Sequence, residues 1–190
     1  MLQKIKRVDA LARYPKFPVT DIEKNAWYFP EVYASYRLTV ASDKGPTMAK
    51  DIAANLTLLV ANMSYDSLLF MSDLKFPLYR KPSALPSDIK AVSYLQANNI
   101  GPRFTGAIKV ELPLLKEFTR NLYWMVRTNT ASGAIHFLDE EQNILGSIHY
   151  HGEVLLASLT RETHVKLLSA FKKTAFNTEL VNHPWHYPPP

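Results

Sequence analysis

Apolar and polar residues alternate early in this chain, and a helical stripe follows them. From Tyr36 to Val40 every second residue is apolar, which is typical of a half-buried strand over 33–41. Over 47–62 the apolar residues recur at intervals of three and four, which predicts a long and deeply buried helix. The short apolar run at 67–71 then predicts a buried strand.

The remainder of the chain continues this mixture of strands and helices. Prolines over 73–86 indicate a long surface loop. Further helices are expected at 88–97, 111–127 and 160–174, the last capped by Thr160, and further strands at 104–110, 134–138, 144–150 and 154–158. These elements predict an α+β fold, in which a mainly antiparallel sheet of about five or six strands packs with three long helices. A C-terminal β-meander followed by a helix is its most regular part.

Both ends of the chain look irregular. Three prolines predict an N-terminal arm over residues 1–30, in which Thr20 or Asp21 caps a short helical turn. A Pro-rich C-terminal tail is expected over 177–190, and its last residues favour the polyproline II conformation. We therefore expect a single domain over 1–190, with an arm and a tail.

Two parts of the chain are similar in the order of their elements. The strand–helix–strand units over 33–71 and 104–138 have final strands that end in the related tetrapeptides Phe-Met-Ser-Asp and Phe-Leu-Asp-Glu. One interpretation is a duplicated βαβ unit with a site between two halves related by a pseudo-twofold axis. The other is chance similarity between two ordinary α+β segments.

The amino-acid composition excludes several classes of site and favours a globular protein. The 190 residues are 47% hydrophobic and 21% charged, as in a globular domain with one core. Cysteine is absent, which excludes disulfides, thiolate zinc sites and cysteine nucleophiles. The longest apolar stretch, 52–63, is interrupted by polar residues and falls short of the roughly 20 residues of a membrane helix. We therefore expect a cytoplasmic protein with no membrane partner.

Positive charge brings nucleic acid into consideration. The net charge of +5 is a mild excess that favours encounters with polyanions. Lys4, Lys6 and Arg7 precede several aromatic residues within the expected arm, a combination that can bind single-stranded nucleic acid. The alternative is that the arm lies across the domain with its aromatic side chains buried.

The helix over 111–127 carries a second candidate surface. Trp124 falls opposite its apolar stripe, with Lys116, Arg120 and Arg127 nearby. A tryptophan among basic side chains suits base stacking, phosphate contact or the anchoring of a partner protein. The alternative is that both faces of the helix are covered and that Trp124 lies beneath the arm or the proline-rich loop.

Histidines on the C-terminal hairpin form a third candidate. If the turn centres near residues 141–142, His136 lies opposite Ser147, and His136, His149 and His151 share one face of the sheet. Neutral imidazoles at that spacing could bind zinc or act as acid and base. The alternative is three solvent-facing histidines with no common task.

The sequence shows no standard catalytic signature, such as a Gly-rich phosphate loop, G-x-S-x-G, H-E-x-x-H or a calcium loop. The acidic residues 139–141 fall in the expected hairpin turn, where we expect them to be solvated. We expect a non-enzymatic binding or regulatory protein that acts through contacts with another protein or with itself and needs no cofactor. The alternatives are a nucleic-acid-binding protein with a basic-aromatic surface, and an enzyme or metal-binding protein that uses the histidine face.

Overall fold

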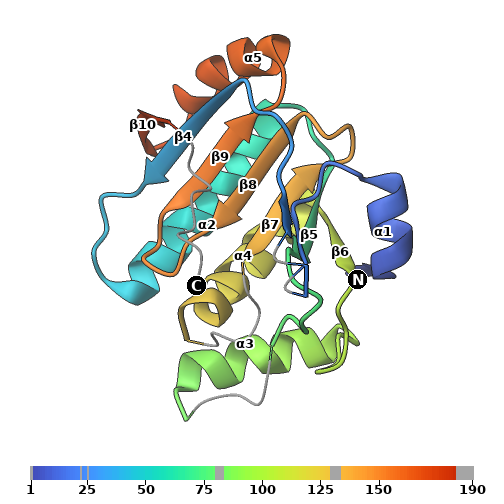
Figure 1. Ribbon diagram of the computed structural model, residues 1–190. Coiled ribbons are helices and arrows are strands. Elements are labelled where there is room, and N and C mark those ends of the chain that lie inside the picture. The colour runs from blue at the N-terminus through green and yellow to red at the C-terminus, as the bar shows by residue number, and fades with distance from the viewer. Residues whose placement is uncertain (1, 22, 25, 80–83, 129–133, 183–190) are drawn as a thin grey trace.

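A large antiparallel sheet forms the centre of the molecule (Figure 1). The computed structural model describes residues 2–182 apart from 22, 25, 80–83 and 129–133. In sheet order the eight strands of the described residues are β1 (Gln3–Ile5), β6 (Ala107–Glu111), β5 (Ser67–Ser72), β7 (Ile135–Asp139), β8 (Ile144–Ile148), β9 (Val154–Ser158), β4 (Ala34–Thr39) and β10 (Asn177–Val181). Every neighbouring pair is antiparallel.

Helices cover the two faces of the sheet unequally. One face carries α2 (Gly45–Asn62), α4 (Leu112–Thr128) and α5 (Arg161–Phe171), and α3 (Pro86–Ala97) packs beside α4. The other face carries α1 (Arg7–Arg13). A separate hairpin pairs β2 (Val19–Asp21) with β3 (Ala26–Tyr28). No helix built from the described residues is long and apolar enough to cross a membrane.

Because both sides of a strand are covered in the middle of the sheet, two cores form. The larger core lies between the sheet and the main helix layer, where Phe70 packs against Phe118 and Phe137 with ring centroids 4.7 and 5.6 Å apart. The smaller core lies under α1 and comprises Ala10, Tyr14, Phe17, Leu69, Met71, Ala107, Leu138 and Leu145. The strands β5 and β7 are therefore buried on both faces, which explains the apolar run Leu-Leu-Phe-Met within β5.

The α+β class and the mainly antiparallel sheet are confirmed, but the prediction of five or six strands and three long helices understated the fold. The described residues form eight strands in this sheet and five helices. The extra strands β1 and β10 lie at its two edges, within the expected arm and tail. The part of the tail beyond residue 182 lies outside the described residues.

The arm contains strands where a helical turn was expected. Thr20 does not cap a helix, because its hydroxyl donates to the Asp73 carboxylate at 3.0 Å and its N–H donates to the Asp73 carbonyl at 3.1 Å. These bonds hold Thr20 in an extended strand opposite Trp27. The short helix of this region lies earlier, in α1, and Tyr14 and Phe17 just after it are buried.

The two strand–helix–strand units occupy the sheet differently. The strands on either side of α2, β4 and β5, are separated by β9, β8 and β7, whereas those on either side of α4, β6 and β7, are separated by β5 alone. Phe70 and Phe137, which begin the two related tetrapeptides, lie directly opposite each other across β5 and β7. This unequal spacing is not that of two halves related by a pseudo-twofold axis.

The β7–β8 turn is built around Asp139, which is buried rather than solvated as expected. Its carboxylate accepts the backbone N–H groups of Asn143 and Ile144 at 2.7 and 2.8 Å. Glu140 pairs with Lys109 at 2.7 Å, and only Glu141 is fully exposed. The acidic residues of this turn therefore organise the hairpin.

Candidate functional site

Of the three predicted basic residues of the arm, Lys4 and Arg7 donate hydrogen bonds to backbone carbonyls elsewhere in the same chain. The Arg7 guanidinium donates to the carbonyls of Ser72 and Asp73, both at 2.8 Å. Burial lowers the pKa of Arg7, an effect that the nearby Asp73 carboxylate opposes. The Lys4 ammonium donates to the Asn99 carbonyl at 2.9 Å, while Lys6 is exposed. Arg7 therefore ties the start of α1 to the end of β5.

Trp124 is half-buried and packs against the beginning of α2. A β-carbon added to Gly45 would lie 3.0 Å from the Trp124 ring, and the Tyr123 ring meets the indole edge-on with centroids 5.2 Å apart. At least part of the cover on Trp124 therefore comes from α2. Arg127 donates to the Tyr123 hydroxyl at 2.6 Å.

The other predicted basic residues of α4, Lys116 and Arg120, are exposed, and so is most of Arg127. At 100° per residue the three side chains fall within about 40° of one another on the outer side of the helix. They form a basic stripe, and the tryptophan predicted beside it, Trp124, is half-buried. Binding of nucleic acid to this stripe stays a prediction.

The hairpin register confirms the expected pairing of His136 with Ser147. The His136 ring is fully buried and meets the edge of Phe29, with centroids 5.9 Å apart. Burial lowers the pKa of His136 to about 3, because a charged imidazolium would lose its hydration. The ring is therefore neutral near pH 7.

His149 and His151 lie in the turn after β8, with ring centroids 5.2 Å apart. Tyr150 between them is exposed, because the strand ends at Ile148. Burial lowers the pKa of His149, the charge of His151 adds to this, and Glu153 opposes it. Within the described part of the chain, no three His, Asp or Glu side chains are grouped to hold a metal ion. The metal site stays a prediction.

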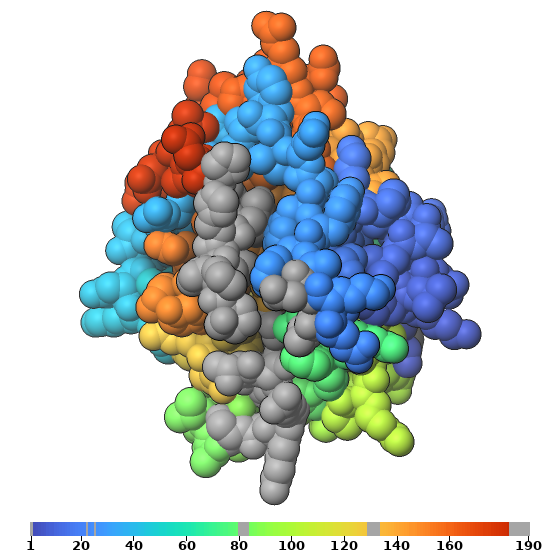
Figure 2. Space-filling view, viewed as in Figure 1, coloured from blue at the N-terminus to red at the C-terminus, as the bar shows by residue number. Residues whose placement is uncertain are grey.

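The sheet edge at β10 was missed from the sequence. β10 pairs with β4 alone among the described strands, with Leu180 opposite Tyr36 and Glu179 opposite Arg37. Leu180 is 65% exposed. Figure 2 shows the red atoms of β10 on the rim of the molecule, close to the orange atoms of α5. Among the residues that the structure describes, no strand pairs with the outer side of β10.

Helix α5 packs on one face of the sheet, near the edge that β10 forms. Tyr36 packs against Phe171 of α5 with ring centroids 5.0 Å apart, and its hydroxyl lies 3.3 Å from Nδ1 of His164. Burial raises the pKa of Tyr36. By helical geometry Leu168 lies within about 60° of His164 and Phe171, so it is on the side of α5 that carries these two residues. Leu168 is 42% exposed.

Exposed apolar side chains gather at this edge, together with one histidine. We call this set the β10–α5 surface, and it comprises Tyr33, His164, Leu168 and Leu180. Edge strands are commonly protected from pairing by a lysine, a proline or a bulge. β10 has the sequence Asn-Thr-Glu-Leu-Val, and its one charge, on Glu179, is paired with Arg37 at 3.6 Å on the opposite face. The edge therefore lacks these protections.

One signal for this strand was present in the sequence. Thr178, Leu180 and Val181 favour extended structure, but the prolines that follow them favour an irregular tail. The pairing also depends on β4, which is far away in the chain.

Comparisons of the chain with protein-family models, with curated proteins and with solved structures found no match.

Proposed function

We propose that this protein acts through protein–protein contacts, and that the β10–α5 surface joins two copies of the chain. The observation that supports this proposal is Leu180, which is 65% exposed on an edge strand with no described strand on its outer side. Strand addition to such an edge is a common mode of protein recognition, because the backbone hydrogen bonds supply affinity and the side chains supply specificity.

The β10 strand of a second copy of the chain is a suitable partner for this edge. Antiparallel pairing of β10 with β10 of a second copy creates a twofold interface, in which the same patch is used twice. In the register that places Leu180 opposite Leu180 of the second copy, Glu179 faces Val181 and not another carboxylate. Leu168 of each α5 then flanks the paired leucines. The interface joins apolar to apolar surface without opposing like charges.

Sedimentation equilibrium over a wide range of concentrations tests the proposal. We expect the unaltered protein to dimerise and the variant Leu180→Lys to remain monomeric, since a lysine on an edge strand opposes pairing. Val8→Lys is the matched control, because Val8 is 78% exposed on α1, away from this edge. It should dimerise like the unaltered protein. A monomer at every concentration, or equal weakening by both variants, would overturn the proposal.

A further inference from the structure

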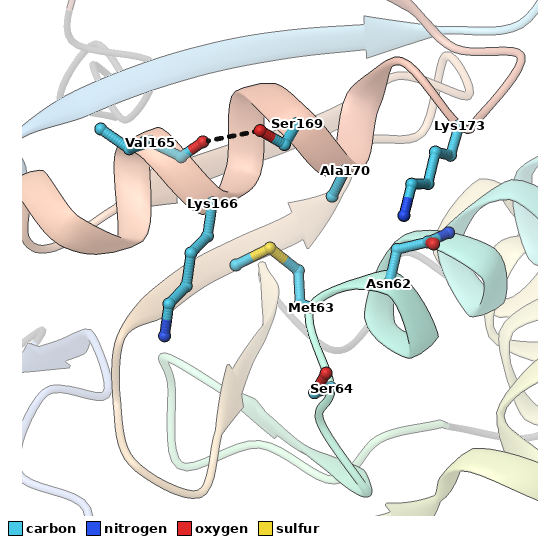
Figure 3. A pocket seen from close by; sticks show the side chains of 8 residues that line it. All are labelled: Asn62, Met63, Ser64, Val165, Lys166, Ser169, Ala170 and Lys173. Atoms are coloured by element: carbon cyan, nitrogen blue, oxygen red, sulfur yellow. Dashed lines mark hydrogen bonds between the residues drawn. The ribbon is translucent and has the colours of Figure 1, made fainter.

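An open hollow of about 380 Å³ lies between the C-terminal end of α2 and α5 (Figure 3), and we call it the α2–α5 hollow. Met63 and Ala170 form the apolar part of its lining, and both side chains are largely buried. A cavity of roughly 150 Å³ accepts a benzene ring, so this hollow has room for a large apolar side chain. Lys166 and Ala170, which line it, lie about 160° around α5 from Leu168. The hollow is therefore separate from the β10–α5 surface.

Two lysines stand on either side of Met63, and Figure 3 shows them directed apart. Lys166 and Lys173 are seven residues apart in the chain, so a helical path places them within about 20° of each other around the axis and about 10 Å apart along it. The chain keeps turning beyond the end of α5, because the Lys173 N–H donates to the Ala170 carbonyl at 3.1 Å. Two separate positive charges therefore flank one apolar spot.

The two ammonium groups are not neutralised by the described part of the chain. Lys166 and Lys173 are exposed, and neither forms an ion pair with a described residue. The lining, as far as the structure describes it, contains no carboxylate. The segment 161–173 carries four basic residues and one acidic residue. An acidic partner is therefore the one that this surface attracts.

Uncharged polar groups of the lining are used within the protein. The Ser169 hydroxyl donates to the Val165 carbonyl at 3.4 Å, and the Asn62 side-chain amide donates to the Leu58 carbonyl at 2.7 Å. Both bonds run back along the helix that carries the side chain. Recognition at this hollow therefore depends on the two lysines and on the apolar spot between them.

A helix of a partner protein can match this pattern. Because every α-helix rises 1.5 Å per residue, two carboxylates seven residues apart have the same spacing of about 10 Å as Lys166 and Lys173. Apolar residues three and four positions after the first carboxylate fall between the two on the same face of that helix. Such a helix, lying along α5, brings one carboxylate to each lysine and an apolar side chain over Met63.

The helices of this chain do not supply that pair of carboxylates. Each of the five described helices contains a single acidic residue, and these are Asp9, Asp51, Asp88, Glu117 and Glu162. A second copy of the chain therefore cannot present two carboxylates from one helix to the hollow. The pattern fits a different protein, and this contact is independent of the one between two copies.

We propose that the α2–α5 hollow docks an acidic amphipathic helix of a partner protein. Lys166 and Lys173 each pair with one carboxylate of that helix, and Met63 lies beneath its apolar side chain. The two charged contacts fix the position and the direction of the helix along α5, and the apolar contact adds affinity.

NMR titration of the ¹⁵N-labelled protein at constant ionic strength, with a synthetic helical peptide as the probe, tests this proposal. The probe has about 18 residues, mainly alanine and glutamine, with capped ends. It carries two glutamates seven residues apart and leucines three and four positions after the first. We expect saturable shifts of the amide signals of Met63 and of residues 165–173. A second probe of the same composition, with one glutamate moved to the opposite face, should bind about fivefold more weakly or less.

Charge reversal identifies the residues that hold the probe. We expect the double variant Lys166→Glu/Lys173→Glu to weaken binding by about tenfold or more, and to bind a probe in which both glutamates are replaced by lysine. That exchange of preference separates lost docking from a loss of folding. Lys172→Glu is the matched control, because Lys172 is exposed beside Lys173 but does not line the hollow. It should change the affinity by less than about threefold.

Several results would overturn the proposal. One is the absence of saturable shifts, and another is shifts that fall outside the hollow. Equal binding of the two glutamate probes would show that the spacing of the lysines is not recognised. An equal loss in Lys172→Glu and in the double variant, or a double variant that does not bind the lysine probe, would show that Lys166 and Lys173 are not the contacts. A monomeric protein that binds the probe as expected would contradict only the contact between two copies.

Discussion

Leu180 lies directly opposite Tyr36 where β10 pairs with β4, yet Leu180 is 65% exposed and Tyr36 only 6%. The difference arises because Phe171 and His164 of α5 cover Tyr36 but do not extend over the next strand. The sheet is therefore one strand wider than the helix layer on this side. An apolar side chain on an open edge is the physical basis of the proposed contact between two copies.

Asp139 should be the most sensitive residue of the β7–β8 turn. Asp139→Ala leaves the backbone N–H groups of Asn143 and Ile144 without their acceptor, and we expect the free energy of unfolding to fall by about 2–4 kcal/mol. Asp139→Asn keeps one acceptor oxygen and should lose less. Urea denaturation measures both changes. The exposed Glu141→Ala is the control, and an equal loss there would refute this role of Asp139.

Gly152 is required by its backbone and by its neighbour. Its φ is +94°, and a β-carbon added there would collide with the sulfur of Met48. Gly152→Ala should therefore lower the free energy of unfolding by about 1–3 kcal/mol. At Gly101 an added β-carbon meets no atom within 4 Å, so Gly101→Ala should have almost no effect in the same thermal or urea unfolding experiment. Similar losses in the two variants would contradict this account.

Arg7 should matter for stability rather than for binding. In Arg7→Lys the ammonium cannot reach the carbonyls of Ser72 and Asp73 in the geometry of the guanidinium, so we expect a loss of about 1–3 kcal/mol in the free energy of unfolding. The exposed Lys6→Ala should lose little. If Arg7→Lys keeps full stability but weakens binding to an oligonucleotide, the nucleic-acid prediction gains support and this structural role is wrong.

Burial of His136 predicts a dependence of stability on pH. The pKa of His136 is about 3 in the folded protein and 6.5 in an exposed reference state, so below pH 6.5 the unfolded chain gains a proton that the folded protein does not. Between these values the free energy of unfolding should fall by about 1.4 kcal/mol per pH unit as the pH decreases.

The variant His136→Gln isolates this contribution, because it removes the titrating ring and leaves the carboxylates unchanged. Urea denaturation of both proteins from pH 7 to pH 4 gives the two slopes. We expect the stability of the unaltered protein to fall more steeply with decreasing pH than that of the variant. Parallel curves would show that His136 titrates normally in the folded state.

The inner elements of the fold could be predicted because their periodicity is local. The strand at 154–158 is observed with the expected bounds, and Thr160 caps α5 by accepting the Thr163 N–H at 3.1 Å. The turn position gave the correct pairing of His136 with Ser147, since alternation allows only one register that keeps apolar residues on the core face.

The edges and the candidate surface could not be predicted in the same way. β1 has three residues, which is too few for alternation to distinguish a strand from a loop, and β10, with the sequence Asn-Thr-Glu-Leu-Val, shows no regular alternation of apolar and polar residues. Helical periodicity predicts Trp124 opposite the apolar stripe, whereas in the structure Trp124 is half-buried against the main core, and its contact with Gly45 depends on how α2 and α4 pack together. Pairing and packing between distant segments are properties of the whole fold, and one sequence does not encode them in a local pattern.

Amide hydrogen exchange at low and high protein concentration tests the contact between two copies most directly. About half of the N–H groups of an edge strand point away from its partner strand, and they exchange rapidly unless another chain binds them. We predict that protection over Asn177–Val181 increases with concentration, while the other edge strand, Gln3–Ile5, stays unchanged. Equal exchange of β10 at all concentrations, or an equal increase at both edges, would contradict the account.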